Sequence, residues 1–393
     1  MIEKMKLSLQ SLVIFRGLLR DDVFIRLSEL LDSDALPLTD KVSRYADFAA
    51  ALFAHGGSLT DYVWERVAED DNIYVQKCAQ RLSIDKTLTE CLEHELRALQ
   101  ELSLLTSSRL KAHIGYEGYL PDWQNSTIDF SAAYARHLDN LATDGYGIYA
   151  KNRMLRVHNG AIVPVKYPDP VRLADLKGYE RQKKLIVGNT LALLRGQPAA
   201  NALLYGDAGT GKSSTVKAIV NEYYASGLRL VEIPKSRFGD IPAVAETLST
   251  NPLKFILFID DLSFTQQNDD FNALKAVLEG SVSAKATNIV IYATSNRRHM
   301  VKELFSDREG DDIHRNETIQ ELTSLSHRFG LTVGFFKPDK KAYLDIVHAL
   351  KDEYGIQMDD AQLDLEAERF ASAGRSPRMA RQFIDMLRRT SGE

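Results

Sequence analysis

The segment Gly206-Asp207-Ala208-Gly209-Thr210-Gly211-Lys212-Ser213 decides the fold of this chain. It matches the pattern G-x-x-x-x-G-K-[ST], and it stands directly after an apolar run and directly before a segment of helical periodicity. A glycine-rich turn between a strand and a helix directs backbone N–H groups at phosphate oxygens, and the helix N-terminus favours their negative charge. A chance match to the four fixed positions is expected in a chain of this length on the order of 1% of the time. The segment therefore predicts a phosphate-binding loop.

The loop also predicts which residues hold a nucleotide and its cation. Lys212 has the reach to contact the terminal phosphates of ATP, and the Ser213 hydroxyl is the expected ligand of Mg²⁺. The predicted nucleotide-binding residues of the loop are Gly206, Asp207, Ala208, Gly209, Thr210, Gly211, Lys212, Ser213 and Ser214.

A second apolar run, at 255–259, ends in the pair Asp260 and Asp261. A buried strand that ends in carboxylates delivers them to the edge of such a site, which is the Walker B position. We expect Asp260 to hold Mg²⁺ through water, and we expect Asp261 to orient or deprotonate the attacking water. Two aspartates at a strand end can also be simple N-capping residues, which is the alternative interpretation.

Composition describes an ordinary soluble protein. The chain has 393 residues, enough for two or three domains, with 44% hydrophobic and 26% charged residues. Its net charge of −5 and pI near 6.0 argue against a protein that coats nucleic acid, although a local basic strip stays possible. Apolar runs do not approach the roughly 18 residues of a membrane span. The two cysteines, Cys78 and Cys91, fit a reducing compartment, so we expect a cytoplasmic protein.

The periodicity divides the chain into several parts. Apolar residues recur three or four apart up to about residue 141, which predicts an all-helical N-terminal domain over 1–150. Two short apolar runs around Asn159-Gly160 predict a hairpin, and we expect 151–170 to be a hairpin and linker that joins the two halves. An α/β nucleotide-binding domain is expected over 171–337, followed by a helical lid over 338–393.

Strand-like runs separated by helical segments support this α/β class. They predict a five-stranded, mainly parallel sheet, with strands at 201–205, 228–233, 255–259, 288–294 and 331–336. Lid helices are predicted at 340–354, 361–372 and 376–389. Ser376 followed by Pro377 forms a good N-cap and first-turn pair for the last helix.

With these motifs in order, the chain resembles the AAA+ ATPase superfamily. The resemblance implies that Asn296 is sensor 1, which helps to place the attacking water, and that Arg378 is sensor 2 in the lid. It implies that Arg328 is an arginine finger that completes the site of a neighbouring subunit, a role suited to a permanently charged, planar guanidinium. Tyr179, before the first helix of the domain, resembles the ring contact of the adenine. A helix cap, a surface arginine, a solvated lid arginine and a core tyrosine are the respective alternatives.

The segments 206–214, 258–264 and 292–299 resemble more narrowly a bacterial AAA+ family catalogued as domain of unknown function 815, over roughly residues 145 to 390. That family name implies ATP binding and no substrate. A long acidic stretch between Asn296 and Arg328 makes Arg315 and Arg308 fallback candidates for the finger. Many related ATPases have Glu at the position of Asp261, which reaches one methylene less far, so slow turnover stays possible. Phe238 stands where unfoldases carry an aromatic pore loop, but a packing role is the favoured interpretation.

These features favour an ATPase that remodels or loads a macromolecular partner as a homo-oligomer or partner-assembled ring. Residues 1–150 would recognise the unknown target. An ATP-dependent switch or adaptor that barely hydrolyses ATP is the first alternative. A helicase loader acting on DNA is the second, with a basic surface that would include Arg297, Arg298, Arg375, Arg381, Arg388 and Arg389. Nucleic acid is thus possible as a partner but not indicated.

Overall fold

The computed structural model describes residues 2–262, 286–296 and 328–390. The chain separates into two compact units, Met1–Lys151 and Asn152–Glu393, and each is described by itself.

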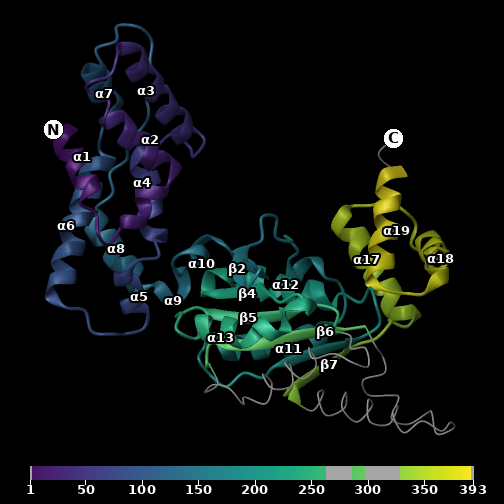
Figure 1. Ribbon diagram of the computed structural model, residues 1–393. Helices are drawn as coiled ribbons and strands as arrows, with labels where there is room; N and C mark the ends of the chain where they lie inside the picture. The colour runs from purple at the N-terminus through teal and green to yellow at the C-terminus, as the bar shows by residue number, and fades with distance from the viewer. Residues whose placement is uncertain (1, 263–285, 297–327, 391–393) are drawn as a thin grey trace. The chain divides into compact units, whose positions relative to one another are not determined.

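The first unit is built from helices (Figure 1). They are α1 (Ile2–Gln10), η1 (Arg16–Arg20), α2 (Asp22–Leu31), α3 (Leu38–Phe53), α4 (Leu59–Glu69), α5 (Ile73–Ala79), α6 (Lys86–Ser103), α7 (Ser107–Ile114), α8 (Phe130–Asp139), α9 (Leu141–Asp144) and α10 (Ile148–Lys151). Short polar side chains cap their N-termini: the Asp21 carboxylate accepts hydrogen bonds from the first turn of α2, and the Ser58 hydroxyl accepts one from the first turn of α4.

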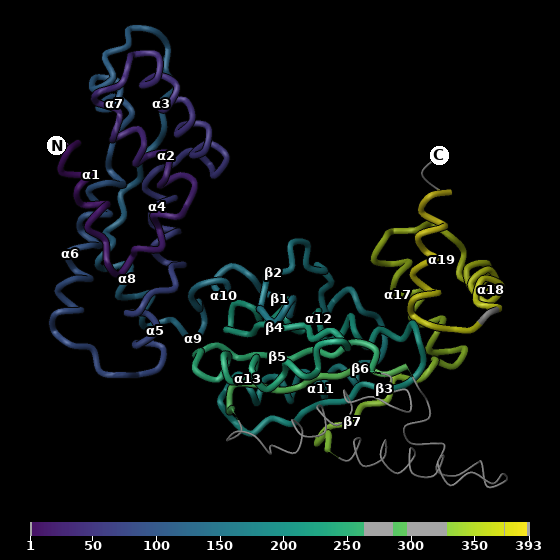
Figure 2. The backbone as a smooth tube through the Cα atoms, in the orientation of Figure 1, coloured from purple at the N-terminus to yellow at the C-terminus, as the bar shows by residue number. Residues whose placement is uncertain are grey.

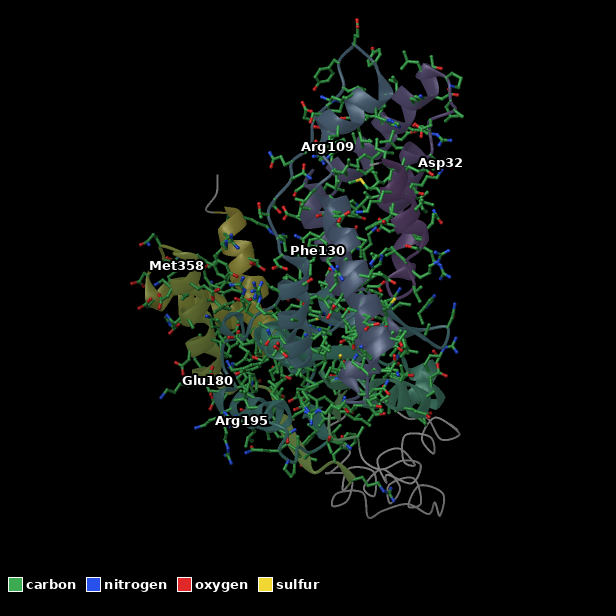
Figure 3. The ribbon with its side chains drawn as sticks, turned by 90° about the vertical axis from the view of Figure 1, so that its left-hand side faces the viewer. Asp32, Arg109, Phe130, Glu180, Arg195 and Met358 are labelled. Atoms are coloured by element: carbon green, nitrogen blue, oxygen red, sulfur yellow. The ribbon has the colours of Figure 1, made fainter. Side chains whose placement is uncertain are left out.

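The apolar faces of most of these helices meet in one core, and Val75, Leu141 and Tyr146 form a second, smaller cluster. Members of the main core include Leu27, Phe48 and Leu96, which stand on the helical stripes that the sequence shows. Phe130 is fully buried against Trp64, and Figure 3 shows it among the helices, whereas Asp32 lies at the outer surface of this unit. Burial of such side chains from water supplies the main stabilisation of a helical unit.

A buried carboxylate ties the start of the chain to α6. Both oxygens of Glu95 accept backbone N–H groups, from Val13 at 2.7 Å, Ile14 at 3.1 Å and Phe15 at 3.0 Å. The donors satisfy a charge that would otherwise be costly to bury. None of the described helices is long and apolar enough to cross a membrane.

In the part of the second unit that the structure describes, seven strands form one sheet in the order β2-β1-β4-β5-β6-β3-β7, so the expectation of five strands was wrong. Its strands are β1 (Met154–His158), β2 (Ala161–Pro164), β3 (Ala202–Gly206), β4 (Leu228–Glu232), β5 (Lys254–Ile259), β6 (Ile289–Ser295) and β7 (Leu331–Phe335). The two extra strands are the predicted hairpin, which turns at Asn159 and Gly160, both at positive φ.

The hairpin does more than join two halves of the chain, because β1 pairs in parallel with β4 and extends the sheet. Among the described strands, the pairs β4–β5, β5–β6, β6–β3 and β3–β7 are also parallel, and only β2 runs antiparallel to its neighbour. Figure 2 shows β1 beside β4 along the backbone tube.

Helices cover the sheet on both faces. α11 (Glu180–Leu194) and α12 (Lys212–Tyr223) share one buried cluster with alternate strand residues such as Leu204 and Ile256. The connection through α13 (Ile241–Ser249) steps back from β4 to β5, opposite to the step through α12, so right-handed crossovers put α13 on the other face. Phe238, in η4 (Lys235–Asp240) just before α13, is buried at 2% exposure, which is a packing position.

The lid follows β7 as a small helical bundle (Figure 1). Its helices are α17 (Lys340–Tyr354), α18 (Asp360–Phe370) and α19 (Pro377–Thr390), which share a core of their own. The Ser376 hydroxyl accepts the N–H of Met379 at 3.2 Å, so the predicted N-cap of the last helix is confirmed.

Candidate functional site

The glycine-rich loop connects β3 to α12 at the carboxyl edge of the sheet. Gly209 and Gly211 adopt φ values of +77° and +91°, which a side chain would disfavour, and Gly211 is the N-cap of α12 without a side-chain cap. A cavity of about 490 Å³ lies against the loop. It is lined by loop residues, by the segment 169–179 and by the lid helices α17 and α19, including Tyr179, Gly209, Thr210, Gly211, Ser214, Thr215, Arg378 and Arg381.

The Lys212 side chain is buried beside the loop. Its ammonium donates to the carbonyl oxygens of Gly206 at 3.0 Å and Asp207 at 2.8 Å, and to Oδ1 of Asn296 at 2.9 Å. Burial lowers the pKa of Lys212, the carboxylates of Asp207, Asp260 and Asp261 oppose that shift, and the Arg378 guanidinium adds to it. A partly desolvated cation at the start of a helix is well suited to an anionic phosphate group.

A compact hydroxyl and carboxylate cluster occupies the centre of this edge. Oδ1 of Asp260, just after β5, accepts from the Ser213 hydroxyl and from the Thr294 hydroxyl, both at 2.6 Å. Thr294, on β6, is 2% exposed and also accepts the N–H of Asp261 at 2.9 Å. A serine hydroxyl and a carboxylate at this spacing are the oxygen ligands that Mg²⁺ prefers, so the residues fit the cation.

The neighbouring carboxylate, Asp261, is held from two sides. Its Oδ1 accepts from Nδ2 of Asn296 at 2.9 Å, and its Oδ2 lies 3.1 Å from the ammonium of Lys235 in η4. Asp261 is also a non-glycine residue at φ +54°, a conformation that costs free energy and is concentrated at functional sites. A continuous chain of contacts therefore runs from Lys212 through Asn296 and Asp261 to Lys235.

Tyr179 and Arg378 both line the cavity, from different elements of the chain. Tyr179 lines it while stacking on Phe335, with 5.2 Å between ring centroids, and its hydroxyl donates to the carbonyl oxygen of Phe336 at 2.6 Å. Burial, with a smaller contribution from the charge of Asp207, raises the pKa of Tyr179 to about 12. Arg378 lines the cavity from α19, and its backbone N–H donates to the Gly209 carbonyl oxygen at 3.2 Å.

Arg328 is the one predicted site residue in the described part of the chain that lies away from this group. It precedes the first residue of β7, whereas the last residues of β7 pair with the last residues of β3, beside the loop. Because the two strands are parallel, Arg328 lies toward the opposite edge of the sheet and does not line the cavity. The fallback candidates Arg308 and Arg315 lie outside the described residues, as do Arg297 and Arg298.

Three residues make contacts at the site that were not predicted from the sequence. Thr294 and Lys235 reach the two aspartates from other elements, and the Asp207 carboxylate accepts the backbone N–H of Lys337 at 2.8 Å. A threonine inside an apolar strand was a detectable signal, since a buried hydroxyl needs a partner. Lys235 offered no comparable signal.

A family model described as a protein of unknown function, DUF815, matches residues 149–391, which is more than half of the chain. This match includes every strand of the sheet, the loop and the lid.

Curated relatives match a smaller part. The replication factor C large subunit of Staphylothermus marinus is 34% identical over 122 residues, covering 29% of this chain and 28% of that protein. The corresponding subunit of Ignicoccus hospitalis is 31% identical over 139 residues, covering 34% of this chain and 28% of that protein. The chain thus spans little more than a quarter of the length of these relatives.

Solved structures that are similar include the Holliday junction branch migration motor RuvB of Thermotoga maritima, at 19% identity and a TM-score of 0.36, with coverage of 57% of this chain and 65% of that chain. A single-residue variant of the same motor, in which alanine replaces an arginine, gives 19% identity and a TM-score of 0.37, with coverage of 58% and 66%.

Proposed function

The chain belongs to the DUF815 family, which is described as being of unknown function, and we propose that it binds ATP with Mg²⁺ and hydrolyses ATP to ADP and phosphate. The observation that carries this proposal is the convergence of Lys212, Ser213, Asp260, Asp261 and Asn296 on one edge of the sheet, beside a cavity.

ATP binding follows from the loop and the walls of the cavity. The backbone N–H groups of the loop and the Lys212 ammonium bind the phosphates, and Arg378 contacts them from the lid. Tyr179 lines the part of the cavity that suits the base. Ser213 and Asp260 hold Mg²⁺, which neutralises phosphate charge when it is bound.

Hydrolysis depends on Asp261 and Asn296. The Asp261 carboxylate orients the attacking water and accepts its proton, because it lies beside the phosphate-binding lysine and at the open edge of the sheet. Asn296 contacts both Lys212 and Asp261, so it keeps the phosphate-binding cation and the water-activating carboxylate in register.

We further propose that the chain works as an assembly on a macromolecular partner. Arg328 lies away from the cavity of its own chain, which fits a guanidinium that completes the site of a neighbouring copy. The helical unit of residues 1–151 is a separate compact body and is the part proposed to recognise the target.

The test is the rate of ATP hydrolysis per subunit as a function of protein concentration, with Mg²⁺ present. A specific rate that rises with concentration supports sites that are completed between subunits. A Lys212→Ala variant must lose both ATP binding and hydrolysis. Normal hydrolysis by that variant would exclude this cavity as the site.

One observation favours a second candidate, an ATP-dependent switch with slow turnover. The Asp261 carboxylate accepts hydrogen bonds from both Asn296 and Lys235, so it must give up at least one of these contacts to bind and activate a water molecule. ATP binding with negligible hydrolysis, even with partners added, would favour the switch over the motor.

The described residues give less support to a DNA-loading surface. Arg375 forms two hydrogen bonds to Glu368 at 2.8 and 2.7 Å, and Arg388 lies over the Tyr354 ring at 4.4 Å. Arg381 donates to the Tyr354 hydroxyl at 2.8 Å. These guanidinium groups are thus engaged within the lid.

A further inference from the structure

Asp207 is an unexpected residue for a loop that binds phosphates. Its carboxylate is negative, and like charges at short range repel each other. The residue is nevertheless 9% exposed at the second position of the loop. A buried carboxylate needs hydrogen-bond donors around it, and Oδ2 of Asp207 accepts the backbone N–H of Lys337 at 2.8 Å.

Lys337 lies in the connection between β7 and α17, where the chain leaves the sheet and enters the lid. Asp207 also contacts the end of β7 just before this connection, since its own backbone N–H donates to the carbonyl oxygen of Phe335 at 2.9 Å. The two backbones approach closely here: a Cβ on Gly206 would lie 2.2 Å from that carbonyl oxygen. Tyr179 adds a third contact through its hydroxyl and the carbonyl oxygen of Phe336.

The lid also contacts the loop at Gly209, two residues after Asp207. The Gly209 carbonyl oxygen accepts the backbone N–H of Arg378, the first-turn residue of α19 that lines the cavity. The loop is therefore joined to the connection that leads into the lid at residue 207, and to the last lid helix at residue 209.

The carbonyl oxygen of Asp207 also accepts the Lys212 ammonium at 2.8 Å. One residue thus contacts both the cation that is proposed to bind phosphate and the connection to the lid. A change in the position of that ammonium acts directly on the peptide that follows Asp207.

We propose that Asp207 is a positioning residue that fixes the lid relative to the phosphate loop and so places Arg378 at the nucleotide. This inference rests on the proposed function for its effect on ATP, but the lid position can be measured without nucleotide. The side chain does not touch the reacting atoms. It acts through the backbone of Lys337 and through the lid that follows.

The variants separate the hydrogen bond from the charge. Asp207→Ala removes the acceptor, whereas Asp207→Asn keeps an oxygen that can accept the Lys337 N–H. The matched control is Asp339→Ala, which removes the N-cap of α17 two residues further along, where Asp339 accepts the N–H of Ala342 at 2.8 Å. The control weakens the lid helix but leaves the link between the loop and the connection intact.

The first measurement is the distance between spin labels on the core and the lid, introduced as Glu222→Cys in α12 and Arg369→Cys in α18. The full chain is used, with Cys78 and Cys91 replaced by alanine. Without nucleotide, we expect Asp207→Ala to broaden or shift the distance distribution, whereas Asp207→Asn and Asp339→Ala keep that of the parent. A distribution unchanged by Asp207→Ala would overturn the inference.

The second measurement is the dissociation rate of a fluorescent ADP with Mg²⁺. We expect Asp207→Ala to raise this rate about tenfold, as for the loss of one hydrogen bond to a charged group, and we expect Asp207→Asn to recover most of the loss. If the parent chain binds no nucleotide at all, the proposed function fails, and the label distances still decide the role of Asp207. Nucleotide binding with equal dissociation rates in all variants counts against Asp207 alone.

Discussion

The ammonium of Lys235 lies 3.1 Å from Oδ2 of Asp261, on two segments that follow adjacent parallel strands. Both side chains are about half exposed, at 43% and 54%. The pair holds the carboxylate that is proposed to activate water, so it restrains the group on which the proposed hydrolysis depends.

Removal of this restraint is expected to raise basal turnover. Lys235→Ala frees one oxygen of Asp261, and because exposed ion pairs contribute roughly 0 to 1 kcal/mol, the expected increase in kcat for ATP is up to about fivefold. The neighbouring variant Arg237→Ala, whose guanidinium is 3.8 Å from Asp240, should leave kcat unchanged. A lower kcat for Lys235→Ala would mean that the lysine assists catalysis.

Thr294 is expected to be required for the alignment of both aspartates. Thr294→Val removes a buried hydroxyl that donates to Asp260 and accepts the N–H of Asp261, at a cost of about 1 to 3 kcal/mol for the groups left unpaired. We expect kcat to fall at least tenfold while binding of ATP without Mg²⁺ stays near that of the parent chain. Thr294→Ser retains the hydroxyl and should retain most of the activity. Equal rates for the two variants would remove Thr294 from the site.

Complementation between subunits tests the role of Arg328. Alone, Arg328→Ala should hydrolyse ATP at least about 100-fold more slowly than the parent, because a guanidinium supplied in trans typically contributes a factor of 10³ or more to kcat. Lys212→Ala alone should be slowed at least as much, because it lacks the cation that is proposed to bind the phosphates. A mixture of the two should recover part of the activity, since an intact Arg328 can then serve an intact loop on another copy. Failure of the mixture to recover, in a sample shown to form mixed oligomers, argues against a finger at this position.

The first unit contains a pH-sensitive carboxyl group. Burial raises the pKa of Asp70 to about 6, with Asn72 opposing the shift by donating to its Oδ2 at 3.1 Å. Because the folded-state pKa lies above the unfolded value of 3.8, the folded chain binds the proton of Asp70 more tightly than the unfolded chain does. The contribution of Asp70 to the free energy of unfolding is therefore fully present at low pH and is lost as the pH rises from about 4 to 6.

Asp70→Asn should therefore stabilise the chain at pH 7. Partial exposure to solvent reduces the effect to about 1 kcal/mol, or roughly 2 to 4 °C in the Tm of the transition that unfolds this unit. The gain should disappear near pH 4, where the native aspartate is already protonated in the folded chain. Thermal unfolding at both pH values, with Asp85→Asn at an exposed helix cap as a comparison, measures it. A gain that is equal at pH 4 and pH 7 would contradict this assignment.

Local sequence was sufficient to predict the glycine-rich loop between a strand and a helix, the principal strands and the lid helices. The glycines of the loop, the apolar run before Asp260 and the Ser376-Pro377 pair each act within a few residues of chain, so their effect can be predicted without the fold. The same applies to the hairpin turn at Asn159-Gly160, whose conformation depends on those two residues.

The tertiary structure decided what these local elements contact. The parallel pairing of β1 with β4 joins residues about 75 apart in sequence, and it adds the predicted hairpin to a sheet for which local periodicity indicated five strands. Thr294 contacts Asp260 and Lys235 contacts Asp261 across the carboxyl edge of the sheet, and Asp207 bonds to Lys337 across 130 residues of sequence. Periodicity records which face of an element is buried, but it does not record which distant group lies opposite. The sequence by itself predicted the glycine-rich loop between a strand and a helix, whereas the fold decided which side chains hold the aspartates and join the loop to the lid.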